Sequence, residues 1–371
     1  MVRKSNLLLV FPDEWLSHSP TLLNLVHIFK DSFNVRVISI DDSVFRNSRL
    51  NDACFSFIKV NKHFSVFFLR RIRVIYGVLK SILLLRELRK LIRVQAVDGV
   101  IGVDSIGLWV AQKVFGSAHF LSLEVNRDFF FRSCRPDRIL SVATQSKERA
   151  GFLFNNPPAR TFLLPNAPIL PETFPGAFIN KKFNGRLIYL GVILPTHGIY
   201  PCLDVMEKIA GTGATLTIKG VLYKNRVRQS IRKRYRRLFN DGTVFLDQEY
   251  VAQDDLINFL SDFSVGFCFY DFTRISLRDF NYLSSPSGKL FNYYAAGVPV
   301  IGTDVLGLRS VRDFNAGILL KDHTPEAIGD AFEKISQNFD FYRQNCLKAA
   351  ANFDFRRAVT PYRDFLLSQG S

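Results

Sequence analysis

Residues 284–304, SSPSGKLFNYYAAGVPVIGTD, form the most informative stretch of the sequence. A Ser/Pro/Gly loop leads into a helical pattern, and a tight Gly-Val-Pro turn then precedes a short apolar strand. The first-turn N–H groups of such a helix point outward and favour an anion. Lys289 stands in that turn, where a cation opposes the helix dipole unless an anion binds beside it, and Asn292 follows on the same face. A phosphate-and-sugar ligand would suit both side chains, while the simpler alternative is a capped helix with a solvated lysine.

Short apolar runs alternate with helical patterns along the rest of the chain. In the second half, strands are expected at residues 186–190, 215–219, 244–246, 264–270, 299–302 and 316–320, with a long loop at 271–287. In the first half, strands are expected at residues 6–11, 34–40, 97–103, 118–125, 137–142 and 161–164, and a helix at 107–114. This alternation predicts α/β domains built on parallel sheets, with ligands at the carboxyl ends of the strands.

The two halves are separated by residues 165–185, which contain four prolines and two glycines and are the best candidate for a linker. A chain of 371 residues also suits two domains of ordinary size. We therefore expect one domain at residues 1–170 and a second at 171–352.

Composition excludes several classes of protein. The apolar run at residues 7–11 is followed at once by acidic residues, so it is read as a first strand and not as a signal peptide, and no run approaches the ~20 residues of a membrane span. Five scattered cysteines argue against a disulfide framework or a structural zinc site and favour a reducing cytoplasm. The formal charge of +16 favours polyanionic partners such as nucleic acid, anionic lipid headgroups or phosphorylated ligands.

The segment 284–304 resembles the nucleotide-sugar motif of GT-B glycosyltransferases of the group 1 or family 4 kind, P-x-K-L-x-E-Y-x-A-x-G-x-P-V-I. The matching residues are Pro286, Lys289, Leu290, Tyr293, Ala295, Gly297, Pro299, Val300 and Ile301. LIYLG…HG, TLTIKG, VFLDQEY, VGFCFY and AGILLKDHTPEAI also resemble segments of that family's second domain. The resemblance implies two doubly wound Rossmann-like domains facing across a cleft: an acceptor-binding domain at 1–170, completed by a returning helix at 353–371, and a nucleotide-sugar-binding domain at 171–352.

This resemblance implies roles for individual residues. Lys289 would pair with the donor diphosphate, and Asn292 would replace the glutamate that usually holds the donor ribose. The serine hydroxyls and backbone N–H groups before the helix would contact phosphate, and Gly191 would let its loop approach the ligands closely. A second cation would come from Lys219, Arg274 or Arg278. The candidate donor-binding residues are Gly191, Lys219, Tyr250, Ser285, Ser287, Gly288, Lys289 and Asn292.

Two departures from the family pattern favour an inverting mechanism or a divergent family. Ser284 and Asn292 stand where retaining members carry two glutamates, and Val192 replaces the usual arginine. An inverting reaction needs a general base. Glu124 is the first candidate because it ends an apolar strand, where a carboxylate is costly unless it is used or paired; the alternative is an ion pair with Arg127 or Arg132. The candidate catalytic residues are Glu124, Asp104 and His18.

A basic amphipathic pattern covers residues 69–93, LRRIRVIYGVLKSILLLRELRKLIR. Such a helix can lie on an anionic membrane surface, or it can pack its apolar face on the domain's sheet, and both can hold at once. We expect membrane contact because the acceptors of similar enzymes are often lipid-linked. The candidate membrane residues are Arg70, Arg71, Arg73 and Lys80. A second basic run at residues 226–237 either does the same or is a solvated helix face.

The expected function is transfer of a sugar from a UDP- or GDP-sugar to a glycan or lipid-linked glycan, in cell-surface polysaccharide synthesis on the cytoplasmic side of a membrane. We expect no cofactor and no metal, since the sequence has no isolated DxD in a suitable loop. One alternative is a nucleotide-sugar epimerase or hydrolase on the same fold. The other is a basic nucleic-acid-binding protein, although no recognised nucleic-acid module is present and no nucleic acid partner is expected.

Overall fold

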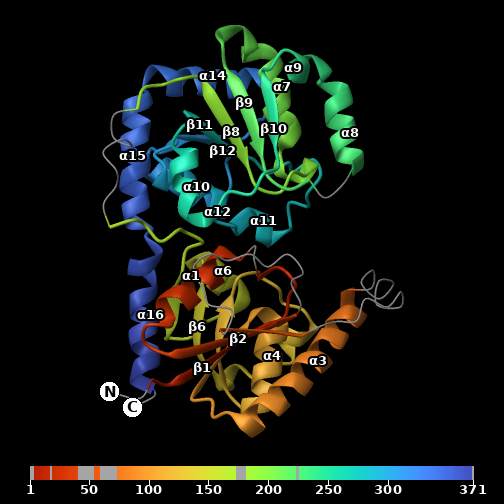
Figure 1. Cartoon of the computed structure of the whole chain (residues 1–371), viewed down its shortest axis with the longest axis vertical. Helices are drawn as coiled ribbons and strands as arrows, with labels where there is room; N and C mark the ends of the chain where they lie inside the picture. Colours follow the sequence, from red (N-terminus) through yellow and green to blue (C-terminus); the bar gives the residue numbers. More distant parts are fainter. Residues whose placement is uncertain are drawn as a thin grey trace. The chain divides into compact units, whose positions relative to one another are not determined.

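The computed structural model describes residues 4–16, 19–40, 54–58, 73–172, 181–222 and 225–369. The chain divides into two compact units, of which the first comprises Met1–Pro165 with Phe355–Ser371 and the second comprises Asn166–Asp354. Each unit contains one parallel sheet with helices packed against it (Figure 1). The expected α/β architecture of two doubly wound, Rossmann-like domains is confirmed.

The sheet of the first unit has the strand order β3-β2-β1-β4-β5-β6-β7, and all its strand pairs are parallel. Its strands are β1 (Asn6–Phe11), β2 (Asn34–Ile40), β3 (Phe55–Ile58), β4 (Gly99–Val103), β5 (Ala118–Ser122), β6 (Ile139–Thr144) and β7 (Thr161–Leu163). Its helices are α1 (Pro20–Phe29), α3 (Arg73–Val94), α4 (Asp104–Phe115), α5 (Phe129–Arg132), α6 (Lys147–Leu153) and α16 (Phe355–Gln369). Strand order reverses between β1 and β4, which is where such sheets bind ligands.

Helices cover both faces of this sheet, as right-handed crossovers require. The helices α3 and α4 pack together, with α3 against β2 and α4 against β4 and β5. The helix α16 packs against β7 and α1, where the Tyr362 ring lies 6.0 Å from the Phe29 ring and 5.1 Å from the Phe162 ring (Figure 1). The last helix of the chain is therefore part of the core of the first unit.

The second unit has the strand order β10-β9-β8-β11-β12-β13, again parallel throughout. Its strands are β8 (Arg186–Leu190), β9 (Thr215–Lys219), β10 (Val244–Asp247), β11 (Val265–Cys268), β12 (Val300–Thr303) and β13 (Gly317–Leu320). Its helices are α7 (Ile199–Ile209), α8 (Asn225–Arg234), α9 (Arg236–Asn240), α10 (Gln253–Leu260), α11 (Phe280–Ser284), α12 (Gly288–Ala295), α13 (Ser310–Asp313), α14 (Pro325–Gln337) and α15 (Phe339–Asn352). Here the strand order reverses between β8 and β11.

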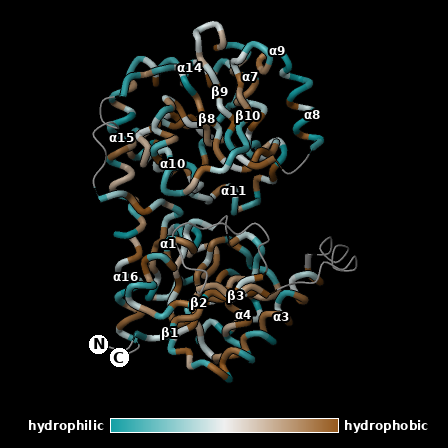
Figure 2. Tube along the Cα trace, in the orientation of Figure 1, coloured by the Kyte–Doolittle hydropathy of each residue, from teal (hydrophilic) through white to brown (hydrophobic). Residues whose placement is uncertain are grey.

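Two apolar layers bury the faces of this second sheet. Leu187 and Tyr189 of β8 join one layer with α7 and α14, while Ile188 between them joins the other layer with α10, α12 and α15. Successive strand residues point to opposite faces, so a strand buried on both faces is apolar throughout. Figure 2 shows the hydrophobic residues gathered along the strands in the middle of each unit.

Four local expectations differ from the structure. The short edge strand β3 was not expected, and the expected loop at 271–287 contains the helix α11, whose N-terminus is capped by the Asp279 side chain. The helix α4 starts at Asp104, earlier than residue 107, and β5 ends at Ser122 instead of residue 125. Short elements and element ends carry few periodic residues, so local contacts decide them.

The boundary between the units lies at Pro165 and Asn166, five residues before the expected one. Ala167 is buried in the core of the second unit, and Leu170 packs on the same cluster. The backbone N–H of Leu170 also donates to Asp354 Oδ1 at 3.1 Å. These contacts attach the start of the proline-rich segment to the second unit; residues 173–180 lie outside the described part.

Along the described residues, no helix has both the length and the apolar content needed to cross a bilayer.

We predict that Gly220→Ala strongly destabilises the second unit. A Cβ at Gly220 would lie 1.7 Å from the Gly191 carbonyl oxygen, and φ at Gly220 is +155°. The expected loss is at least about 2 kcal/mol in the free energy of unfolding, measured by urea denaturation. Gly211→Ala is the matched control, because a Cβ there meets nothing within 4 Å and the expected change is below about 1 kcal/mol. Equal effects of the two changes would contradict this account.

Candidate functional site

Two glycines shape the carboxyl ends of β8 and β9. Gly191 has φ +112°, and its N–H donates to the Lys219 carbonyl at 2.9 Å. Gly220 lies so close to the Gly191 carbonyl that no side chain fits between them. A Cβ on Gly191 itself would meet nothing within 4 Å, so the outer side of this turn is open. A ligand that approached Gly191 closely would have room on this side.

Tyr293 attaches the helix α12 to the carboxyl end of β8. The Tyr293 hydroxyl accepts from the Leu190 N–H at 3.1 Å and lies 3.3 Å from the Ile188 carbonyl oxygen. Its ring occupies the space that a Cβ at Gly266 would fill, at 2.7 Å. The buried ring therefore links α12 to β8 and β11, and it sets the height of the N-terminus of α12 at the carboxyl edge of the sheet.

The N-terminus of α12 has no side-chain cap. Ser287 occupies the N-cap position, but its hydroxyl does not accept from the helix. It interacts instead with the Cys268 thiol and the Tyr270 hydroxyl, and Ser285 also contacts Tyr270. The Leu290 N–H donates to the Ser287 carbonyl at 2.9 Å, so the N–H groups of Gly288 and Lys289 are the ones placed to meet another acceptor.

Lys289 brings a positive charge to the same place. Its Nζ lies 4.7 Å from the centre of the Tyr189 ring, and the side chain is only partly exposed. Within the described residues, no acidic side chain is paired with it. Burial and then the Lys289 charge lower the pKa of His197 to about 4. A cation and a helix N-terminus without a compensating carboxylate form a site for an anion.

His197, in the short 3₁₀ helix η5 (Pro195–His197), was not among the residues singled out from the sequence. Its Nδ1 lies 3.3 Å from the Val192 carbonyl oxygen, and its ring contacts Tyr270 and Tyr282. Because a carbonyl only accepts, Nδ1 carries the proton and Nε2 of the neutral ring is an acceptor, suited to a sugar hydroxyl. The His-Gly pair of the LIYLG…HG segment was the signal in the sequence that could have pointed to His197. The glycine is required there because a Cβ on Gly198 would collide with Phe269.

The other residues that were expected to contact the donor are either paired with acids or exposed. Lys219 is 5% exposed, and its Nζ lies 2.6 Å from Asp247 Oδ2. Although partial burial acts to raise the pKa of Asp247, the hydrogen bond and charge of Lys219 and the hydrogen bond from the Glu249 N–H together outweigh it, and the pKa is lowered. Arg274 is likewise paired, with Asp271 at 3.0 Å. Tyr250 is 60% exposed in the segment after β10, and Asn292 is partly exposed on α12.

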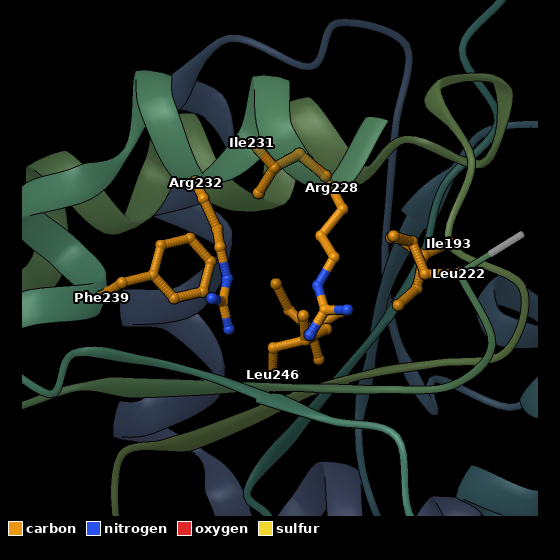
Figure 3. A pocket seen from close by; sticks show the side chains of 8 residues that line it. Ile193, Leu222, Arg228, Ile231, Arg232, Phe239 and Leu246 are labelled. Atoms are coloured by element: carbon orange, nitrogen blue, oxygen red, sulfur yellow. The ribbon is translucent and has the colours of Figure 1, made fainter. Parts of the chain in front are cut away.

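A pocket under α8 contains none of these residues. In Figure 3, Arg228 and Arg232 extend from α8 toward the strands, over a lining of Ile193, Ile218, Leu222, Ile231, Phe239 and Leu246. Their aliphatic stems cover apolar side chains of the sheet. This pocket belongs to the packing of α8 and not to the site around Lys289.

In the first unit, Asp104 is the buried carboxylate at the switch point. It is 7% exposed, has φ +52°, and its Oδ1 accepts from the N–H groups of Leu123 and Glu124, both at 2.8 Å. Burial raises the pKa of Asp104 well above its ordinary value, and the neighbouring carboxylates of Glu124 and Asp13 act in the same direction. Asp104 thus anchors the turn that carries Glu124.

Glu124 lies beyond the end of β5, and its side chain is exposed. The argument from the cost of a buried carboxylate therefore does not apply to Glu124; it applies to Asp104. The turn is held further by Ser122 Oγ, which donates to the Glu124 carbonyl at 2.9 Å, and by the buried Arg149, which donates to the Leu123 carbonyl at 2.6 Å. An exposed carboxylate on a rigid turn is suited to accepting a proton from a substrate.

The loop after β1 adds carboxylates to this end of the first sheet. Asp13 Oδ1 lies 2.5 Å from Lys80 Nζ, and Glu14 accepts from the Tyr76 hydroxyl. Lys80, expected at the membrane, is only 12% exposed in this ion pair. His18, Arg70 and Arg71 lie outside the described residues, as does the side chain of Arg73. Within the described part of the chain, no group of His, Cys, Asp and Glu is arranged to hold a metal ion.

No protein-family model matches the sequence, and no curated protein matches it either. Similar solved structures include HepE from Anabaena in complex with UDP, with a TM-score of 0.68 at 11% identity over 98% of this chain and 100% of that one. The UDP-forming α,α-trehalose-phosphate synthase from Burkholderia vietnamiensis has a TM-score of 0.62 at 12% identity, over 100% and 99% of the chains. The chain has the GT-B fold. A putative UDP-N-acetylglucosamine 2-epimerase from Listeria monocytogenes shares this GT-B fold, with a TM-score of 0.59 at 13% identity over 95% and 94%.

We predict that Lys289→Met removes the binding of a nucleoside diphosphate. The change keeps an apolar stem against Tyr189 but deletes the charge, so the dissociation constant should rise roughly tenfold to a hundredfold. Thermal shift with UDP and GDP measures this. Lys334→Met, on the exposed side of α14, is the control with the same loss of charge. Undiminished binding by Lys289→Met would show that the anion lies elsewhere.

We also predict that Asp104→Ala and Asp104→Asn differ in stability. Alanine leaves two buried N–H groups without an acceptor and tolerates φ +52° poorly, so about 2–4 kcal/mol should be lost. Asparagine keeps the acceptor and should cost less than about 1 kcal/mol at pH 7. Because the folded pKa of Asp104 is raised, the stability that its carboxyl contributes is full below the ordinary pKa of an aspartate and is lost as pH rises toward the folded pKa. The loss caused by Asp104→Asn should therefore be smallest at high pH. Urea denaturation at several pH values tests this, and equal losses for both variants would contradict it.

Proposed function

We propose that this protein is a glycosyltransferase that moves a sugar from a nucleotide-sugar donor to an acceptor hydroxyl. The observation that carries the proposal is Lys289, a cation that has no acidic partner among the described residues and that lies beside the N-terminus of α12, where no side chain of the described residues forms a cap. This arrangement would hold the donor diphosphate and stabilise the charge that grows on it as the sugar leaves. The GT-B fold supports the assignment.

The proposed donor is a UDP- or GDP-sugar. HepE was solved with UDP, and the trehalose-phosphate synthase is UDP-forming, which makes UDP the first nucleotide to test. In the proposed complex, Lys289 and the N–H groups of Gly288 and Lys289 contact the diphosphate, and Asn292 contacts the ribose. His197 Nε2 would accept from a hydroxyl of the sugar. We propose that transfer needs neither cofactor nor metal, because the leaving charge has these protein groups to bind it.

Glu124 is the proposed general base. It would take the proton of the acceptor hydroxyl in an inverting displacement, while Asp104 positions its turn. The exposure of Glu124, the hydrogen bonds that fix the backbone around it, and its place after β5, next to the switch-point residue Asp104, support this role. Glu124→Gln should lower kcat by about a hundredfold or more and change KM little.

The proposed acceptor is a glycan or a lipid-linked glycan of cell-surface polysaccharide synthesis, and the proposed location is the cytoplasmic face of a membrane. The five cysteines are free, which suits a reducing compartment. Both proposals go beyond the fold, because the similar structures include enzymes that act on different substrates.

Product analysis tests the function directly. The full-length protein is incubated with radiolabelled UDP- and GDP-sugars, with and without lipid-linked acceptors, in EDTA and in magnesium. Transfer predicts free nucleoside diphosphate and labelled acceptor in equal amounts, with activity that survives EDTA. The Lys289→Met and Glu124→Gln variants provide the inactive controls. Donor turnover as fast in these variants as in the wild-type protein would refute the assigned roles.

A nucleotide-sugar epimerase or hydrolase is the second candidate, because the Listeria epimerase structure shares the fold. It would convert the donor without any acceptor. An isomeric nucleotide sugar, or free sugar released as fast without acceptor as with it, would favour this candidate over transfer.

A further inference from the structure

The helix α3 has one face buried in the first unit and one face open. Gly77, Ser81, Leu84 and Leu88 are buried and follow one another at the spacing of a helix face. On this side α3 packs against α4 and β2, and a Cβ at Gly77 would lie 3.1 Å from the Phe130 ring. These contacts fix which face of α3 is turned outward.

The open face carries exposed aliphatic side chains. Of the 18 large hydrophobic residues that are exposed in the described part of the chain, six lie on α3. They are Val74, Ile75, Val78, Ile82, Ile92 and Val94. Single exposed apolar residues are ordinary, but a third of them on one helix marks an interaction surface.

Arginines continue the same row along the helix. Val74, Val78 and Ile82 are followed by Arg86, Arg89 and Arg93, at spacings of four, four, four, three and four residues. These three arginines are exposed, and within the described residues none is paired with an acid. Glu87, the one acidic residue of α3, pairs with Lys90 at 2.7 Å. The row is about 28 Å long, aliphatic in its first half and cationic in its second.

We propose that this outer face of α3 docks on an anionic phospholipid surface. Val74, Val78 and Ile82 would enter the boundary of the acyl region, and the guanidinium groups would bind lipid phosphates. The inference rests on the membrane location proposed above and identifies the surface of the protein that would contact the membrane. It does not depend on the donor chemistry.

A second copy of the chain fits this face poorly. Antiparallel pairing of two such rows would bury the arginines of one helix against the aliphatic side chains of the other. Parallel pairing would set arginine against arginine. A bilayer interface, with hydrocarbon and phosphate in adjacent layers, accommodates both halves of the row.

The basic helices α8 and α9 provide an internal comparison. They carry seven arginines and lysines between residues 226 and 237, but their apolar residues face the core and none of them is among the exposed hydrophobics. Arg234 pairs with Asp204 at 2.8 Å, and Arg228 and Arg232 reach over the pocket in Figure 3. This surface offers charge without aliphatic anchors, so it serves as a control for charge alone.

Vesicle sedimentation of the full-length protein tests the proposal. Vesicles of about one third phosphatidylglycerol in phosphatidylcholine are compared with phosphatidylcholine alone. The triple variant Arg86→Ser, Arg89→Ser, Arg93→Ser should lower partitioning about a hundredfold, and Val78→Ser with Ile82→Ser about tenfold without any change in charge. The control Arg226→Ser, Arg236→Ser, Arg237→Ser loses the same charge and should change partitioning less than about threefold.

The outcomes separate the proposal from its competitors. Equal losses in the two arginine variants would mean non-specific attraction of a basic protein and would overturn it. Wild-type protein that ignores anionic vesicles, or that forms a dimer disrupted by Val78→Ser with Ile82→Ser, would overturn it as well. Thermal shift with UDP, run on every variant, reports on the second unit, so a failure of membrane binding is distinguished from a failure of donor binding.

Discussion

The hydroxyl of Tyr293 is the contact on which the candidate donor site depends. It ties α12 to the backbone of β8, and the missing side chain at Gly266 lets the ring lie directly against β11. Because α12 is held at this height, its N-terminus opens beside the Gly191 turn and Lys289 lies over Tyr189. A buried polar group must be hydrogen-bonded, and here that requirement fixes the position of a functional helix.

The two units use carboxyl ends of parallel strands for opposite electrostatic purposes. In the second unit, the cations Lys219 and Arg274 are paired with acids, while Lys289 has no acidic partner in the part of the chain that the structure describes. In the first unit, Asp13, Asp104 and Glu124 follow the carboxyl ends of β1, β4 and β5, and burial, aided by repulsion from the other two carboxylates, raises the pKa of Asp104. One end therefore suits a negatively charged ligand and the other suits the removal of a proton.

Sequence reasoning was strongest where a residue's role follows from periodicity. Strands such as β8 are apolar throughout because both faces are buried, so the two parallel sheets could be predicted. The GT-B fold was expected from the resemblance of residues 284–304 to a family motif. The place of Lys289 followed from the loop, helix and turn around it. Pairing could not be predicted: Lys219 finds Asp247, and Lys80 finds Asp13, across distances in sequence that no pattern records. The burial argument for Glu124 failed because β5 ends at Ser122, two residues before Glu124, and strand ends are set by contacts such as those of Asp104.

The first unit is built from two separated pieces of chain, whereas the second is one uninterrupted stretch. In the first unit, α1 and β7 pack against α16, whose Tyr362 and Phe365 rings lie 5.1 Å and 5.4 Å from the Phe162 ring. During synthesis α16 emerges only after every residue of the second unit has left the ribosome. The order of completion is therefore inverted relative to the order of translation: the second unit can close its core first, and the first unit carries an incomplete apolar face until α16 has been made.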